Sequence, residues 1–169
     1  GGNGDVINNL ISNPCMLGGT TTATGWTINI LSGTAINSKV ARSNGLEWQE
    51  IEFLTLGEFR MTFPISTNFV VGDKLKLITE IEVDSNITTL DYISNNLQFK
   101  TSGGATLSES AGLYIEPNSL FRFPNIAISG VITTQEKEVP NTCGLLYVKL
   151  HGKALGKIRL GRCRIVKVV

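Results

Sequence analysis

Three acidic residues alternate in the stretch EIEVD, namely Glu80, Glu82 and Asp84. In an extended strand, residues two apart project from the same face and lie roughly 6–7 Å apart, which is twice the rise per residue. This separation falls between the carboxylate spacings of retaining and inverting glycosidases, so the stretch raises the possibility of acid–base chemistry on a sugar. Lys74 and Lys76 share the same face. An acidic strand face balanced by lysines explains these residues without catalysis, and glycosidase activity is the lesser alternative.

Other groups used in catalysis are scarce. EWQEIEF brings Glu50 and Glu52 into a similar arrangement, and we interpret them in the same way. His151 is the single histidine, and on an alternating strand we interpret it as a surface or interface residue rather than a proton shuttle. The sequence contains no H-E-x-x-H, G-x-S-x-G or P-loop motif. We therefore expect no enzyme, no catalytic residue, no cofactor and no metal site.

Aromatic and amide side chains point to sugar binding instead. Flat aromatic faces stack on sugar rings, while amides and charged groups hydrogen-bond to hydroxyls. We expect Trp26 to fill the edge of the core beneath the first turn, and Trp48, which shares a face with Leu46 and Glu50, to be a candidate for ligand contact. The other aromatic and amide candidates are Tyr92, Asn96, Gln98, Tyr114 and Tyr147.

The end of the chain is basic, because residues 139–169 contain seven Lys or Arg residues and no acid. Arg159, Arg162 and Arg164 suit bidentate contacts with the carboxylates or phosphates of an acidic capsule or lipopolysaccharide. Alternatively, the basic end and the acidic remainder neutralise each other within the fold or its oligomer. No nucleic-acid-binding motif accompanies these arginines, so we expect no nucleic acid partner.

The segments that carry these residues alternate between apolar and polar side chains, as half-buried β-strands do. In KLKLITEIEVD, residues 75, 77, 79, 81 and 83 face one way and the charged residues face the other. EFRMTFPI, LLYVKLHGK and KIRLGRCRIVKVV alternate in the same manner. The last of these slips phase at Gly161, which indicates a β-bulge. Turn signals recur at close intervals, and the best helix candidate, TLDYISNN (89–96), fits a loop and strand equally well.

These patterns predict an all-β protein, a two-sheet antiparallel β-sandwich of jelly-roll type with little helix. The 169 residues form one domain, 1–169, and the Gly-Gly start suggests a fragment of a larger protein. No apolar run is long enough to cross a membrane, so we expect no membrane insertion. The three cysteines, Cys15, Cys143 and Cys163, argue against a disulfide framework and for folding in a reducing cytoplasm, with a Cys143–Cys163 bridge as the alternative.

The two ends of the sequence resemble jelly-roll carbohydrate-binding modules, especially those that bind xylan and glucan. NLISNPCMLGGTTTATGW is similar to their opening pattern, N-L-[IV]-x-N-x-x-F-E-x-G followed by a turn and G-W. The matching residues are Asn9, Leu10, Ile11, Asn13, Gly18, Gly25 and Trp26. GKIRLGRCRIVKV is similar to the closing strand, and GDKLKLITEIEV to an internal strand. Arg162 and Cys163 stand near the family's closing acids, so we expect no structural calcium there.

Two further resemblances bear on function. EIEVD resembles the E-I-D-x-E signature of laminarinase-like jelly-roll glycosidases, with Glu at the middle position and Asp at the last. The basic closing segment resembles terminal modules of bacteriophage tail fibres and tailspikes. Together, the resemblances imply a non-catalytic, trimeric carbohydrate-binding module that recognises cell-surface polysaccharide or lipopolysaccharide. It would fold in a bacterial cytoplasm and act on a virion or outside the cell. The alternative is a structural trimerisation cap of a fibrous protein with no ligand.

Overall fold

The computed structural model describes residues 9–114 and 128–169. This part of the chain is antiparallel β-structure with one short 3-10 turn, η1, at Ser43–Gly45. The strands are β1 (Thr27–Ser32), β2 (Ala35–Ala41), β3 (Glu47–Ile65), β4 (Lys74–Val83), β5 (Thr89–Lys100), β6 (Thr106–Tyr114), β7 (Ile128–Thr133), β8 (Lys137–Glu138) and β9 (Leu145–Val168). Within the described residues, no helix is long and apolar enough to cross a membrane.

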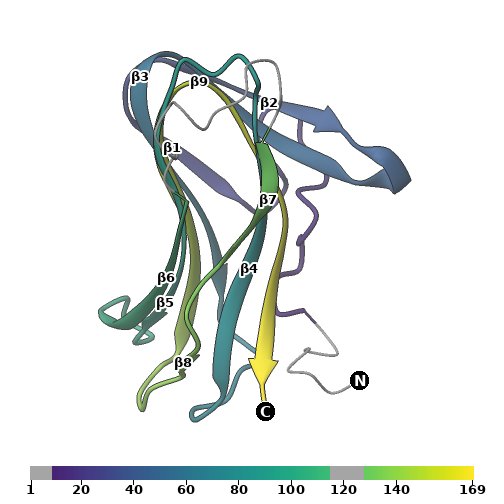
Figure 1. Ribbon diagram of the computed structural model, residues 1–169. Coiled ribbons are helices and arrows are strands. Elements are labelled where there is room, and N and C mark those ends of the chain that lie inside the picture. Colours follow the sequence, from purple (N-terminus) through teal and green to yellow (C-terminus); the bar gives the residue numbers. More distant parts are fainter. Residues whose placement is uncertain (1–8, 115–127) are drawn as a thin grey trace.

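Two long strands, β3 and β9, pass from one layer of the sandwich to the other (Figure 1). The second half of β3 and the first half of β9 lie between β1 on one side and β5 and β6 on the other, and we call this the β5 layer. The first half of β3 and the second half of β9 lie between β2 and β4, with β7 and the short β8 paired to β4, and we call this the β4 layer. The predicted all-β sandwich is confirmed, although its two layers share one continuous hydrogen-bonded sheet.

Glycines occupy the places where β3 and β9 bend. The register between these strands shifts between Phe53 and Gly57. A Cβ atom at Gly57 would lie 2.3 Å from the carbonyl oxygen of Ser32. Gly156 has a φ of +124°, and a Cβ there would lie 3.0 Å from the Cα of Ile87. A larger residue at either position would push backbones apart, so the bends require glycine.

The core lies between the layers and follows the predicted alternation. All five inward positions of β4 that the sequence indicated are buried: Leu75, Leu77, Thr79, Ile81 and Val83. The helix candidate TLDYISNN is instead most of β5. It is extended because β6 and β9 pair with it on its two sides, and because Ile93, Asn95 and Leu97 point into the core.

The opening segment closes one edge of the core, as expected for Trp26. This side chain is 5% exposed, donates a hydrogen bond from Nε1 to the Asn13 carbonyl oxygen at 3.0 Å, and packs against the Phe63 ring with centroids 5.1 Å apart. Asn9 fastens the segment to β9, because its Nδ2 donates to the Cys163 carbonyl oxygen at 3.0 Å. The turns of this stretch therefore hold Trp26 and the end of β9 together.

The bulge predicted at Gly161 is present. Thr79 pairs with Cys163 and Ile81 pairs with Leu160, so that Gly161 and Arg162 together face Glu80. The three cysteines are free, and the alternative of a Cys143–Cys163 bridge is wrong. Cys163 is completely buried, and burial raises the pKa of its thiol to about 12.

Candidate functional site

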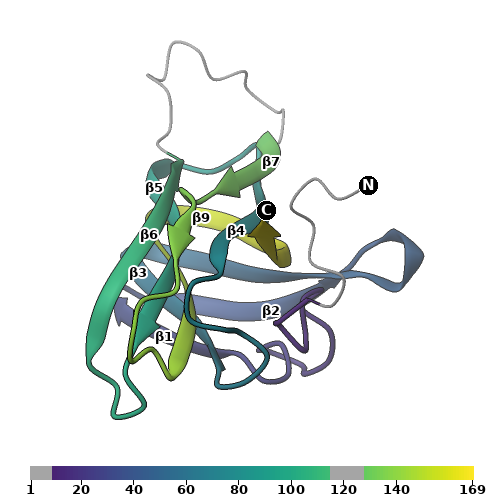
Figure 2. The same ribbon diagram turned by 90° about the horizontal axis from the view of Figure 1, so that it is seen from below.

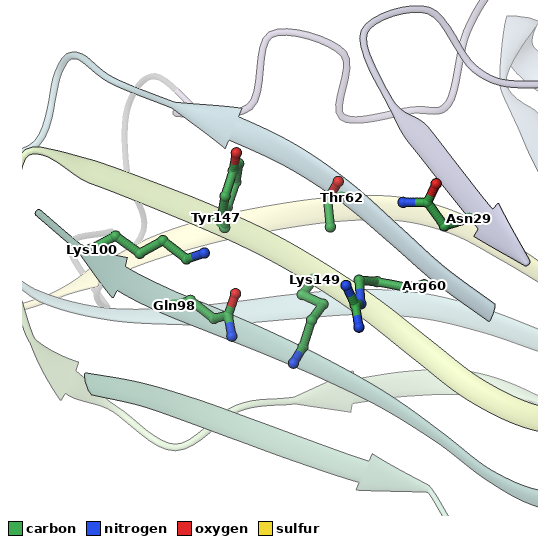
Figure 3. Close-up of a pocket in the computed structure, with 7 residues that line it drawn as sticks. All are labelled: Asn29, Arg60, Thr62, Gln98, Lys100, Tyr147 and Lys149. Atoms are coloured by element: carbon green, nitrogen blue, oxygen red, sulfur yellow. The ribbon is translucent and has the colours of Figure 1, made fainter. Parts of the chain in front are cut away.

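The outward face of the β5 layer carries a row of polar side chains that come from four strands. The register places Asn29 of β1 opposite Arg60 of β3, and Thr62 opposite Lys149 of β9. Gln98 of β5 lies opposite Tyr147 of β9. A shallow cavity of about 370 Å³ lies over these strands (Figure 3). Its lining consists of Asn29, Arg60, Thr62, Gln98, Lys100, Tyr147 and Lys149.

Tyr147 and Gln98 are held in place by their neighbours. The Lys100 ammonium lies 4.4 Å from the centre of the Tyr147 ring, at cation–π distance. Gln98 donates a hydrogen bond from Nε2 to Glu109 Oε2 at 2.9 Å. This bond is the main cause of the lowered pKa of Glu109, and the nearby charge of Lys149 lowers it further. Because its amide nitrogen is engaged with Glu109, Gln98 presents an oriented carbonyl oxygen as an acceptor.

A hydrogen-bonded chain of Tyr92, His151 and Asn96 lies beside the cavity on the same face. His151 Nε2 is 2.9 Å from Asn96 Oδ1, and His151 Nδ1 is 3.3 Å from the Tyr92 hydroxyl. Burial is the main cause of the lowered pKa of His151, and Lys149 and Arg60 lower it further. Burial also raises the pKa of Tyr92. A neutral imidazole that donates from Nε2 and accepts from Tyr92 satisfies this chain.

Trp48, another aromatic candidate, lies on the opposite side of the molecule, on the outward face of the β4 layer. The Arg42 guanidinium stacks 3.9 Å from the centre of its ring and pairs with Glu80 at 3.0 Å. A Cβ at Gly161 would lie 2.5 Å from this ring, so Trp48 covers the bulge of β9. A cavity of about 390 Å³ adjoins Arg42 and Trp48.

The three candidate arginines also lie in the β4 layer, where they differ in their contacts. Arg159 pairs with Glu50 at 2.9 Å and with Glu82. Burial alone would lower the pKa of Arg159, but the hydrogen bonds to Glu50 and Glu82 outweigh burial and raise it. Arg159 is therefore held within the fold. Arg162 and Arg164 line another shallow cavity of about 340 Å³.

The ion pairs partly answer whether the basic end of the chain is neutralised by the acidic remainder. Lys153 pairs with Asp91 at 3.8 Å and Lys167 with Asp73 at 2.9 Å, so part of the basic end is neutralised within the fold. Glu80 and Glu82 of the EIEVD stretch each pair with an arginine on the outward face of the β4 layer. In this arrangement the two carboxylates serve as ion-pair groups of the sheet.

The structure thus divides the predicted site residues between two faces. Gln98 and Tyr147 line the cavity of the β5 layer, and Tyr92 and Asn96 belong to the chain beside it. Trp48, Arg159, Arg162 and Arg164 lie on the β4 layer. The backbone of Tyr114 pairs with Ile93 at the end of β6, and its side chain lies outside the described part of the structure.

Five residues that line the cavity are not among the candidates named from the sequence, namely Asn29, Lys100, Arg60, Thr62 and Lys149. The alternation of EFRMTFPI and LLYVKLHGK does place the last three outward from the core. The pairing of β1, β3, β5 and β9 is what brings these residues together, and no local pattern indicates which strands are neighbours.

No protein-family model matches the sequence, and no curated protein sequence matches it. Solved structures do share its fold. The enzymatically active domain of tailspike protein 4 from bacteriophage CBA120 has a TM-score of 0.66 at 12% identity over 95% of this chain, which spans only 21% of that chain. A CBM61 module in complex with β-1,4-galactotriose has a TM-score of 0.59 at 10% identity, over 95% of this chain and 99% of that chain.

The same fold also occurs in a protein of another class. A Stig cyclase from Fischerella sp. TAU has a TM-score of 0.59 at 12% identity, over 93% of this chain and 95% of that chain. At these identities the likeness establishes the fold alone. The chain has the β-sandwich fold of carbohydrate-binding modules.

Proposed function

We propose that this chain is a non-catalytic glycan-binding module and that the outward face of its β5 layer is the binding surface. The observation that carries the proposal is the cavity over β1, β3, β9 and β5. It combines one aromatic ring, two amides and three cationic groups on rigid strands, and these are the groups that bind sugar rings and hydroxyls. The fold shared with carbohydrate-binding modules supports the same assignment.

The shape of the site sets the expected affinity. The cavity is shallow, and each hydrogen bond to a sugar hydroxyl contributes about 0.5–1.5 kcal/mol net. A handful of such bonds and one ring contact correspond to dissociation constants of about 1 μM to 1 mM. Tight binding by each module is not required if several copies act together.

We extend the proposal to the setting of the module. Its likeness to part of a phage tailspike supports a place in a bacteriophage tail fibre or tailspike, on the virion or outside the cell. The protein would fold first in a bacterial cytoplasm, which agrees with its three free cysteines. The ligand would then be a cell-surface polysaccharide or lipopolysaccharide, bound by a homotrimer.

A glycan array tests the function, and point variants test the face. The wild-type chain is screened against neutral and acidic oligosaccharides in equal numbers, and the best ligand is measured by calorimetry. We expect Y147A and Q98A each to weaken binding by about tenfold or more, which corresponds to about 1.4 kcal/mol. R164A on the β4 layer is the matched control and should bind normally. An array without any bound glycan would contradict the function, and loss of binding in R164A alone would contradict the face.

A structural trimerisation cap is the second candidate, and one surface favours it. Leu31, Ile36, Leu54 and Leu56 are 46–53% exposed around the β1–β2 connection and the bend of β3. A cluster of exposed aliphatic side chains is typical of surfaces that are covered in an assembly. In this function the cluster would be buried between copies of the chain.

The oligomeric state tests the cap. Light scattering coupled to size-exclusion chromatography should give a trimer for the wild type and a monomer for the double variant L54S/L56S if the cluster is an interface. V131S, which changes another exposed aliphatic residue on β7, is the control and should leave the mass unchanged. A monomeric wild type at high micromolar concentration would contradict the cap.

A further inference from the structure

We infer that the glycan bound on the β5 layer is anionic, and that a carboxylate of an acidic sugar is taken by Arg60 and Lys149. This inference rests on the proposed function and specifies its ligand class. It places the acidic ligand on the face opposite to the arginines of the closing segment, Arg162 and Arg164.

The first observation is the charge of the cavity lining. Arg60, Lys100 and Lys149 come from three different strands, and no acid lines the cavity. Figure 3 shows Arg60 and Lys149 close together on the face, with Gln98 on the neighbouring strand. Arg60 pairs in register with His151, and Lys149 with Thr62, so Arg60 and Lys149 are diagonal neighbours across β3 and β9. Long side chains at diagonal positions can reach one common group between them.

The second observation concerns the ion pairs of Arg60 and Lys149. Among the described residues, neither Arg60 nor Lys149 forms an ion pair. In the β4 layer, by contrast, Arg42 pairs with Glu80, and Arg159 with Glu50 and Glu82. Within residues 9–114 and 128–169, the fold therefore pairs the arginines at the centre of one face with carboxylates and gives Arg60 and Lys149 of the other face no carboxylate partner.

The acidic residues on the same face lie outside the lining. Glu109 is on β6, where Gln98 holds its carboxylate at 2.9 Å. Glu58 is on β3 and pairs in register with Lys153, two positions beyond Arg60. Both are close enough to influence the local field, but neither lines the cavity.

The third observation is the scarcity of aromatic surface. Neutral sugars are held largely by stacking on aromatic rings, whereas this cavity has Tyr147 alone, with the Lys100 ammonium 4.4 Å from its ring centre. The Tyr92 ring meets His151 edge-on, with centroids 5.4 Å apart, beside the cavity. Charge-assisted hydrogen bonds must therefore supply most of the affinity, and a carboxylate is a common sugar substituent that accepts them from a guanidinium.

Matched ligands test the inference on the full chain. Oligogalacturonate, alginate and hyaluronan oligosaccharides are each compared with the carboxyl-reduced form of the same molecule by calorimetry, at low and high salt. We expect at least one acidic member to bind ten times more tightly than its reduced form and to lose affinity as salt increases. The double variant R60Q/K149Q should bind both members of that pair equally, whereas R60K/K149R should keep the preference.

The matched control is R162Q/R164Q, which removes the same charge from the opposite face and should leave the preference unchanged. Equal binding of acidic and reduced members by the wild type would overturn the inference and leave glycan binding intact. A preference lost in R162Q/R164Q and kept in R60Q/K149Q would also overturn it. If neither member of any pair binds and the array shows no neutral ligand either, these results contradict the proposed function itself.

Discussion

Asn95 is a buried amide that joins the two layers. From β5 its Nδ2 lies 3.3 Å from the Leu77 carbonyl oxygen, 3.0 Å from Thr79 Oγ1 and 3.0 Å from the Ile132 carbonyl oxygen. These acceptors belong to β4 and β7. The amide therefore satisfies polar groups of one layer from a strand of the other, in a region where water does not compete.

We expect N95D to destabilise the protein, because it replaces the donor with a second acceptor that faces two carbonyl oxygens. The free energy of unfolding in urea should decrease by about 2–4 kcal/mol. N141D, at an exposed turn position, is the control and should change it by less than about 0.5 kcal/mol. Identical unfolding curves for the two variants would contradict the role given to Asn95.

The titration of His151 makes the free energy of unfolding depend on pH between about 7 and 5, where few other side chains titrate. Burial is the main cause that lowers its pKa below 6.5 in the folded protein. The unfolded chain therefore binds a proton at His151 more readily than the folded chain. As pH falls from about 7 towards 5, the unfolded state takes up more protons, and the free energy of unfolding decreases.

The variant H151Q removes this group, and His151 is the only histidine of the chain. Urea unfolding midpoints at several pH values between 5 and 7 should decrease with falling pH in the wild type and change much less in H151Q. A wild-type midpoint that is constant over this range, or one that increases as pH falls, would contradict a buried neutral imidazole.

At the scale of elements, the bulge of β9 is a point where one glycine determines the packing of a face. A Cβ at Gly161 would lie 2.5 Å from the Trp48 ring and 2.9 Å from Arg42 Nη1. The ring would have to move, and with it the guanidinium that stacks on Trp48 and pairs with Glu80.

G161A should therefore lower the free energy of unfolding by about 1–3 kcal/mol and change the tryptophan fluorescence. G130A is the matched control, because Gly130 is an exposed strand glycine whose Cβ would meet nothing within 4 Å. If G161A is as stable as G130A, with unchanged fluorescence, Trp48 does not rest on the bulge.

The strands themselves could be predicted to a large extent. KLKLITEIEV alternates so regularly that every inward residue of β4 was indicated, and the phase slip at Gly161 indicated the bulge. β5 was harder, because Asn95 is a polar residue at an inward position and interrupts the apolar pattern. Its strand conformation depends on β6 and β9, which pair with it from distant parts of the sequence.

The candidate site could be predicted only in part, and for a related reason. Tyr147 and Gln98 stood out because aromatic and amide residues are the usual sugar contacts. Arg60 and Lys149 did not stand out, because an arginine or lysine on an outward strand position is ordinary. Only the register of β3 with β9 makes them diagonal neighbours.

At the scale of the whole molecule, the two layers present faces of different chemistry. The β4 layer carries arginines that are paired with glutamates around Trp48. On the β5 layer, Lys100 lies over the Tyr147 ring, and Arg60 and Lys149 form no ion pair with any residue that the structure describes. The two layers come from the same continuous sheet (Figure 2). Gly57 and Gly156 lie where β3 and β9 pass from one layer to the other. The site residues predicted from the sequence therefore lie on two opposite faces, and one small ligand cannot contact both faces.

The central claim is that a glycan binds the β5 layer, and amide chemical shifts in solution test it most directly. The best oligosaccharide from the array is titrated into the labelled chain. We predict that the shifts that change are those of residues 60–62, 98–100 and 147–149. Changes confined to residues 42, 48, 80 and 162–164 would place the ligand on the β4 layer and contradict the account.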